Sequence, residues 1–176
     1  TLSFVRLETT MYDVVNSNLP DGTTANPYYD SNFPGDPRFL EDKFVRFSYR
    51  FKFDDGEYSI LAPFTQGCFI PQQDGCFLEG DEEQTFASTV VSFAENKVNK
   101  IDLFVPLPDA GNNIENSYKI KELDIVYKES DALAVQVVET LTVSEISTEA
   151  GVNDYFVCSY VSTKPYKTLP ESELIR

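Results

Sequence analysis

The segment that decides the fold runs from Arg46 to Glu57 and reads Arg46-Phe47-Ser48-Tyr49-Arg50-Phe51-Lys52-Phe53-Asp54-Asp55-Gly56-Glu57. Aromatic and polar residues alternate up to Phe53, and this period of two predicts an antiparallel strand with one buried side and one solvent-facing side. Asp55-Gly56 is typical of a tight hairpin turn, because such turns need positive φ angles. Residues 58–62 are expected to return as the partner strand, which makes residues 44–62 a β-hairpin.

The alternation divides the side chains of this hairpin between two faces. The face that we expect to be buried carries Phe47, Tyr49, Phe51 and Phe53. The face that we expect to lie in solvent carries Arg46, Ser48, Arg50 and Lys52. A slip of one residue would turn all four rings to solvent, so the register is expected to be fixed. The basic residues of the second face form a cationic stripe, which either keeps an exposed sheet face soluble or docks onto an acidic neighbouring subunit.

The rest of the chain extends the β pattern. Further strands are predicted within residues 2–15, 98–107, 118–128, 132–143 and 155–161, and a phase slip between Ile120 and Leu123 predicts a β-bulge. Apolar residues at spacings of three and four, after acidic residues at 81–83, predict one helix near residues 82–97. The intervening segments 16–37, 64–80, 109–117 and 144–153 are expected to be loops or connections. The predicted fold class is mainly β, with antiparallel β-sandwiches of the immunoglobulin-like or fibronectin III-like kind.

A weak internal repeat bears on the domain organisation. Residues 44–49 resemble residues 155–160, and both stretches end in Ser-Tyr. The repeat favours two sandwich-like units, residues 1–66 and residues 98–176, joined by an irregular connection and the helix at residues 67–97. One elaborated β domain over residues 1–176 is the alternative, since a chain of 176 residues suits one ordinary domain or two small ones.

Composition narrows the function classes. Asp and Glu number 29 against 14 Lys and Arg, and the net charge of −15 argues against binding to nucleic acid or to an anionic membrane surface. The chain has no histidine, which removes the commonest general base and most zinc sites. No apolar run reaches the roughly 18 residues of a membrane span. We therefore predict a protein that is not an enzyme and that uses no cofactor.

Acidic clusters and cysteines are the residues that would contradict this prediction. We interpret the carboxylates at residues 54–57 and 79–83 as a solvated turn and a helix start, rather than as a glycosidase pair or a calcium site. No stretch matches the spacing of a calcium-binding loop. Cys68 and Cys76 lie close enough in sequence for a local disulfide, and we favour free thiols because nothing indicates an oxidising compartment.

A long loop with aromatic residues supplies the second part of a candidate interface. Residues 16–37 are rich in Asn, Asp, Gly and Pro, and loops of this length are uncommon unless they bind something. The rings of Tyr28, Tyr29 and Phe33 either pin this loop to the body or meet a partner. The candidate interface residues are therefore Tyr28, Tyr29, Phe33, Arg46, Arg50 and Lys52. Aromatic faces also stack on sugars, so a carbohydrate-binding or adhesion module is the alternative function.

A longer part of the chain resembles a known family. The main stretch begins Pro34-Gly35-Asp36-Pro37-Arg38-Phe39, runs to Lys52, and continues with residues 55–59 and 62–66. Weaker stretches lie at residues 99–103, 127–135 and 166–170. These residues resemble large virion structural proteins of tailed bacteriophages, of the type found in marine T4-like phages that infect cyanobacteria. Residues 1–30 fall outside the resemblance.

The resemblance implies a role without catalysis. It implies a component of the phage particle, and we expect a tail-associated module that is located in the virion. Its partners would be other virion proteins and further copies of itself in a homo-oligomer. We also expect the sequence to be a fragment of a longer polypeptide.

Overall fold

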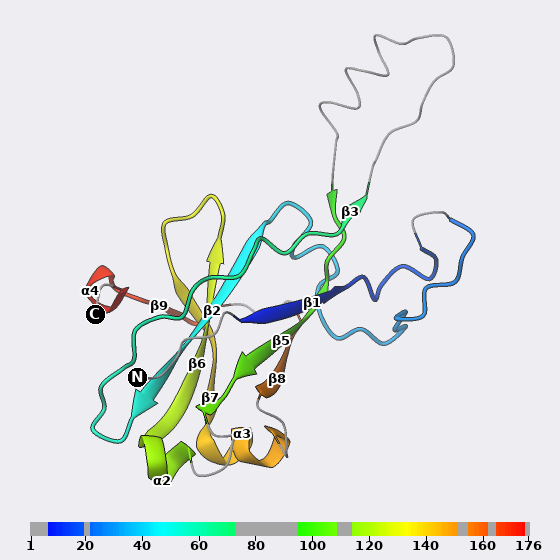
Figure 1. Cartoon of the computed structure of the whole chain (residues 1–176). Coiled ribbons are helices and arrows are strands. Elements are labelled where there is room, and N and C mark those ends of the chain that lie inside the picture. Colours follow the sequence, from blue (N-terminus) through cyan, green and yellow to red (C-terminus); the bar gives the residue numbers. More distant parts are fainter. Residues whose placement is uncertain are drawn as a thin grey trace.

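The computed structural model describes residues 7–19, 22–72, 95–108, 114–150, 155–161 and 165–174. Two antiparallel sheets pack face to face as a β-sandwich (Figure 1). One sheet has the strand order β1-β5-β8, with strands at Glu8–Tyr12, Lys100–Pro106 and Tyr155–Tyr160. The other has the order β2-β6-β7-β9, with strands at Val45–Phe53, Ile120–Glu129, Gln136–Thr142 and Lys167–Thr168. The prediction of a mainly β sandwich is confirmed.

The core lies between the two sheets and contains the predicted aromatic face of β2. Phe47, Tyr49 and Phe51 are buried, and Phe53 is half-buried. The ring of Phe47 lies 5.0 Å from the ring of Tyr160 on the opposite sheet. Aromatic pairs at this separation add to the stabilisation that burial of their apolar surface provides. The predicted inner face of this strand is therefore confirmed.

The pairing of β2 differs from the hairpin that we predicted. Its ladder partner is β6, with Tyr49 opposite Ile125, whereas the segment after the turn returns along the other side of β2 without forming a regular strand. Hydrogen bonds join residues 57, 59, 62, 65 and 68 to Phe53, Phe51, Tyr49, Phe47 and Val45 in turn. This return segment, residues 57–68, mostly advances three residues where β2 advances two. The turn is confirmed, with Gly56 at a φ of 85°, but the regular partner strand is not.

The bulge predicted from the phase slip in β6 is confirmed. Lys52 pairs with Glu122 and Phe53 pairs with Ile120, so Lys121 is the extra residue. A second irregularity lies in β7, because Ile125 pairs with Glu139 and Val126 pairs with Val137. The extra residue Lys121 lets both Ile120 and Leu123 face the core despite their spacing of three.

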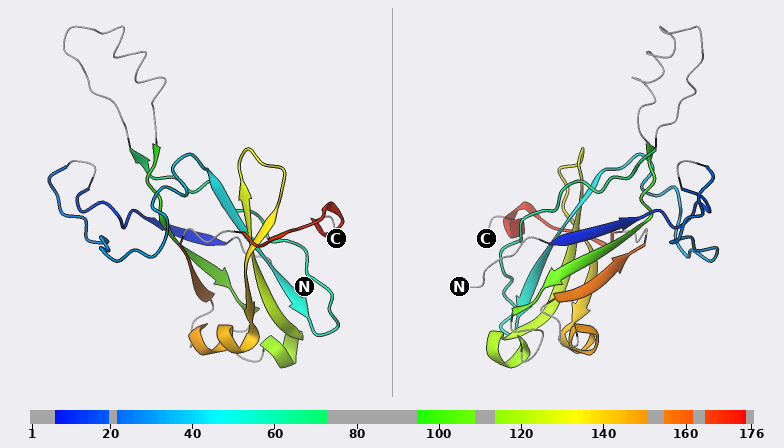
Figure 2. Two further views of the ribbon diagram at one scale, coloured as in Figure 1. Left: turned by 180° about the vertical axis from the view of Figure 1, so that it is seen from behind. Right: turned by 45° about the vertical axis from the view of Figure 1, so that its right-hand side comes forward.

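Short helices close one end of the sandwich. Helix α2 spans Ile114–Tyr118 and α3 spans Val143–Ala150, and both lie at the end opposite the long loops (Figure 2). Helix α4 spans Glu171–Leu174 near the C-terminus. The expectation of an irregular connection at 144–153 is wrong for α3, which begins after Thr142. The carboxylate of Glu145 accepts hydrogen bonds from the Thr142 N–H and hydroxyl, as in a capping box.

The helix predicted near residues 82–97 falls mostly outside the described residues, because residues 73–94 are not described. At its end the prediction is wrong. Glu95–Asn96 forms strand β4, which pairs with β3 at Pro71–Gln72 in a two-stranded ribbon.

Each sheet combines one strand from the N-terminal part of the sequence with strands from its later part. Strand β1 pairs with β5, and β2 pairs with β6, so neither sheet consists of residues 1–66 or of residues 98–176 alone. One apolar cluster contains buried residues from both segments. Among the described residues, no helix is long and apolar enough to cross a membrane.

Candidate functional site

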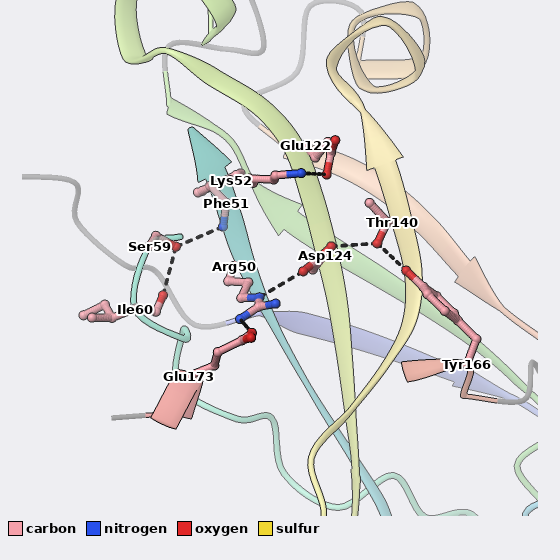
Figure 3. A network of polar contacts seen from close by, with 10 residues as sticks. All are labelled: Arg50, Phe51, Lys52, Ser59, Ile60, Glu122, Asp124, Thr140, Tyr166 and Glu173. Atoms are coloured by element: carbon pink, nitrogen blue, oxygen red, sulfur yellow. Dashed lines mark hydrogen bonds and ion pairs between the residues drawn. The ribbon is translucent and has the colours of Figure 1, made fainter. Parts of the chain in front are cut away.

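The outer face of the four-stranded sheet holds a buried arginine. Arg50 is only 1% exposed, although it lies on the polar face of β2. Its Nε donates to Asp124 Oδ2 on β6 at 2.9 Å, and its Nη1 donates to Glu173 Oε2 on α4 at 3.0 Å. Figure 3 shows these three side chains converging from two neighbouring strands and the C-terminal segment. A buried charge needs such partners, because isolated it would cost many kcal/mol to desolvate.

Further contacts enclose the guanidinium group. Its carbon lies 3.8 Å from the centre of the Tyr58 ring, in cation–π geometry. On the other side of Asp124, Oδ1 accepts a hydrogen bond from Thr140 at 2.7 Å, and Thr140 contacts the hydroxyl of Tyr166 (Figure 3). Arg50 Nη2 is buried and has no hydrogen-bond partner in the part of the chain that the structure describes. The group is well paired but not completely satisfied.

Two segments cover this outer face. Buried side chains from the sheet form a second apolar cluster with Leu169 of the C-terminal segment, residues 165–174. Leu61 and Phe64 of the return segment and Leu174 of α4 pack against that cluster. Ser48, on the same face as Arg50, is also buried, and its hydroxyl donates to the carbonyl of Ala62 at 2.6 Å. The polar residues of β2 predict that this sheet face lies in solvent. Because the two segments cover it, the face forms a second, smaller core.

The predicted cationic stripe is accordingly only partly in solvent. Arg46 is exposed, as predicted, and Lys52 is half-buried in an ion pair with Glu122 at 2.9 Å. The hydrogen bond from Lys52 to Glu122 raises the pKa of that lysine. The prediction that Arg50 and Ser48 face solvent is wrong, because the return segment and the C-terminal segment lie over them. Arg46 lies opposite Lys128 of β6, and the two residues make a small basic site on an acidic chain.

The aromatic loop lies at the far end of the sandwich and is anchored by asparagines. Asn26 Nδ2 donates to the carbonyls of Asp13 and Asn16, and Asn99 links the Asp13 side chain to the N–H of Val14. Both asparagines are buried. Sequence reasoning missed them, because single asparagines in a loop have no periodic signal. Their contacts hold the start of the loop against β5.

The three predicted loop aromatics have different surroundings. Tyr28 is 57% exposed and its ring lies 4.9 Å from that of Tyr12, whereas Tyr29 is 48% exposed. Phe33 is half-buried, and its ring lies so close to Gly35 that any Cβ there would meet it at 2.8 Å. Phe33 therefore folds back over Gly35 of its own loop, whereas the rings of the two tyrosines are exposed on the surface.

A small cavity of about 180 Å³ opens beside Tyr12 and Tyr28. Its remaining lining includes Asp13, Asn18, Asn26 and Lys97. Pockets for drug-sized ligands are typically about 300–1,000 Å³, so this cavity has room for only one small group. The aromatic pair and the amides nevertheless offer both stacking and hydrogen-bonding surfaces.

Neither metal chemistry nor thiol chemistry gains support from the described residues. In that part of the chain, no group of three or more Cys, Asp or Glu side chains is placed to hold a metal ion. Cys68 is a buried free thiol, and burial raises its pKa to about 12. Cys158 is also a free thiol and donates to Glu139. Cys76 lies outside the described residues.

Comparison with known proteins gives no relative. No family model matches the chain, and neither a curated protein nor a solved structure matches it.

Proposed function

We propose that this chain is a structural module of a bacteriophage virion, tail-associated, that acts through protein–protein contacts with other virion proteins. The observation that carries the proposal is the resemblance of residues 34–66 to virion structural proteins of tailed phages. In the structure this stretch supplies β2 and the return segment, which together contribute to both cores. The resemblance thus lies in a part of the chain whose side chains pack in both apolar clusters of the sandwich.

The proposed contact with a neighbouring subunit centres on Arg46. This side chain is exposed and lies opposite Lys128, and among the described residues neither forms an ion pair within the chain. A cationic pair on a chain of net charge −15 favours an acidic partner surface. Arg50 and Lys52, which we had grouped with Arg46, act within the fold instead.

Mass spectrometry of purified phage particles tests the assignment. We expect peptides of this chain in a fixed ratio to other virion proteins, and consistent absence from mature particles would contradict it. A second experiment compares Arg46→Glu with Arg38→Glu, which reverses an exposed charge on the loop before β2. We expect Arg46→Glu alone to reduce incorporation into particles while both chains stay folded.

A carbohydrate-binding module is the second candidate, and the cavity at Tyr12 and Tyr28 favours it. A sugar ring would stack on Tyr28 and meet the polar side chains of Asn18 and Lys97 in the cavity lining. The test is a glycan array followed by titration with Tyr28→Ala and Tyr29→Ala. Loss of binding in the first variant alone supports the cavity as the site, and an array without binding at millimolar concentration removes this candidate.

Within the β-sandwiches, an immunoglobulin-like or fibronectin III-like topology stays a prediction. Constant-type immunoglobulin domains place strands A, B, E and D in one sheet and C, F and G in the other. The orders β1-β5-β8 and β2-β6-β7-β9 do not by themselves reproduce that distribution. An experimental structure that includes residues 73–94 tests the finer assignment.

A further inference from the structure

A small set of contacts holds the C-terminal segment, residues 165–174, on the four-stranded sheet. Strand β9 forms two ladder pairs with β7, and Leu169 is the one buried residue of the segment. Glu173 forms its ion pair with Arg50 at 3.0 Å, and Leu174 packs against the second apolar cluster. The other side chains of the segment are exposed or half-buried. The segment is therefore attached at separate points rather than built into the sheet along its length.

The surface that receives the segment is specific for it. Arg50 pairs with Glu173 of the segment. Thr140, which donates to Asp124, also contacts the hydroxyl of Tyr166 (Figure 3). A buried guanidinium favours an acidic segment, because a carboxylate neutralises its charge and accepts its hydrogen bonds. Residues 165–174 are thus recognised through charge, hydrogen bonds and apolar contacts together.

The segment reaches this surface from the other sheet. Strand β8 ends at Tyr160 in the three-stranded sheet, whereas β9 belongs to the four-stranded sheet. Pro165 begins the segment, and a proline favours extended backbone in the residue before it. Figure 1 shows β9 and α4 at one side of the sandwich, where the chain leads away from the other strands. Such an arm can lie on its own sheet or on the equivalent sheet of a second copy.

The fit of the segment within one chain is incomplete. Arg50 is 1% exposed, and among the described residues its Nη2 has no hydrogen-bond partner. A buried N–H group without an acceptor costs free energy, because it has lost its contact with water and gained no bond in return. The ion pair with Glu173 is also weakened by solvent, since that carboxylate is one-third exposed. The surface therefore binds its own segment less firmly than a fully paired site would.

We infer that residues 165–174 exchange between two copies of this chain, so that the segment of each copy lies on the four-stranded sheet of the other. The contacts are the same within one chain and between two, because the copies are identical, and exchange therefore costs little. It also joins two chains of net charge −15 at a point of attraction, where the carboxylate of Glu173 meets Arg50. A reciprocal exchange has two-fold symmetry and closes as a dimer. The inference does not rest on the proposed virion function.

The test is a disulfide that can form between two chains only when the segment is exchanged. Gln136 and Thr168 are ladder partners on β7 and β9, and such positions lie within the distance that a disulfide spans. One chain carries Gln136→Cys and the other carries Thr168→Cys. Both also carry Cys76→Ser, so the only other thiols are the buried Cys68 and Cys158. After mixing and mild oxidation, we expect a linked product of twice 19.9 kDa.

A control pair separates exchange from chance contact. Thr10 and Asp102 are ladder partners within the three-stranded sheet, which takes no part in the exchange. A mixture of Thr10→Cys and Asp102→Cys chains should give at least about 10-fold less linked product than the first mixture. A second measurement places Gln136→Cys and Thr168→Cys in one chain, which is oxidised at low concentration to lock the segment on its own sheet. In analytical ultracentrifugation this locked chain should stay monomeric, whereas the unchanged protein should shift toward twice 19.9 kDa as its concentration rises.

Several results would overturn the inference. An unchanged protein that stays monomeric at about 200 µM does not exchange its segment, and this result needs no variant. Equal linked product from both mixtures, or a locked chain that still associates, places the contact outside the segment. Linked product from neither mixture means that each segment stays on its own sheet. Linked product from the first mixture alone, together with a monomeric locked chain, supports exchange.

Discussion

The two sheets of this sandwich have very different outer faces. On the four-stranded sheet, the return segment and the C-terminal segment cover the strands and enclose Arg50 together with a second apolar cluster. On the three-stranded sheet, Tyr155 and Val157 remain exposed. The alternation of β2 predicts that Arg50 lies in solvent, yet Arg50 is buried, so local alternation does not determine which sheet face is exposed to solvent. Segments that are distant in the sequence decide it, and the covered face can therefore hold a charge that the open face cannot bury.

Replacing the arginine of the covered face should have the largest effect on this contrast. Arg50→Ala leaves the buried carboxylate of Asp124 without its ion pair, and we expect a loss of about 3–5 kcal/mol in the free energy of unfolding. Arg46→Ala, on the same face of the same strand but in solvent, should cost less than about 0.5 kcal/mol. Urea denaturation of both variants measures the difference. Equal losses would mean that the cover does not protect Arg50.

Alkaline pH should lower the stability of the fold through the region between the sheets, where neutral titratable groups are buried. Burial raises the pKa of Cys68 from 9.0 to about 12 and that of Tyr49 from 10.0 to about 12. Since these pKa values are higher in the folded than in the unfolded chain, their contribution to stability is complete below about pH 9 and is lost as the pH rises toward 12.

We expect the free energy of unfolding to fall by about 5 kcal/mol over this range, because each unit by which a pKa is raised corresponds to about 1.4 kcal/mol. Urea denaturation at several pH values checks it, with tyrosine absorbance to follow ionisation. Cys68→Ala should show a shallower decline than the unchanged protein, and a flat profile up to pH 11 would contradict the prediction.

A pair of identical substitutions compares the two outer faces directly. Val137→Thr places a hydroxyl in the second apolar cluster, where this valine is fully buried, and should cost about 2 kcal/mol. Val157→Thr puts the same hydroxyl on the open face and should change the free energy of unfolding of the monomer by less than about 0.5 kcal/mol. Thermal unfolding at low protein concentration measures both. A similar cost at the two positions would show that the second cluster is not a true core.

The smallest expected effect concerns the contacts that keep the C-terminal segment on the four-stranded sheet. Glu173→Gln removes the charge that pairs with Arg50, and because the carboxylate is one-third exposed we expect a cost of about 1 kcal/mol. Limited proteolysis should cut this variant earlier than the unchanged protein within the C-terminal segment, residues 165–174. Glu171→Gln in the same helix is exposed and serves as the control. Equal cleavage rates would indicate that the apolar anchors Leu169 and Leu174 hold the segment alone.

The sequence was sufficient for features that depend on local periodicity. Alternation predicts strands at β2 and β5, and a run of aromatic and β-branched residues predicts β8. The slip between Ile120 and Leu123 predicts the bulge, because side chains in a strand must alternate between faces. Thr142 and Glu145 match a capping box and could have predicted helix α3. The helix was not predicted because its composition is mostly polar and gives a weak apolar periodicity.

Long-range contacts were beyond reach of the same reasoning. Arg50 meets Asp124 because β2 pairs with β6 in one register, and it meets Glu173 because the C-terminal segment returns over the sheet. Nothing in residues 46–53 specifies either partner. For the same reason, Asn26 and Asn99 were not identified as anchors of the loop that carries Tyr28.

The return segment also bears on how this protein tolerates changes in length. In β2, one inserted residue would turn every following side chain to the opposite face. Residues 57–68 are tied to that strand at intervals of two or three residues and form no ladder of their own, so their side chains do not follow its alternation. One added or missing residue near Ile60, which is exposed and lies between two such ties, can be taken up as a change in the size of a single arc. This margin of the sandwich is therefore closed to other strands while its sequence stays free to lengthen or shorten.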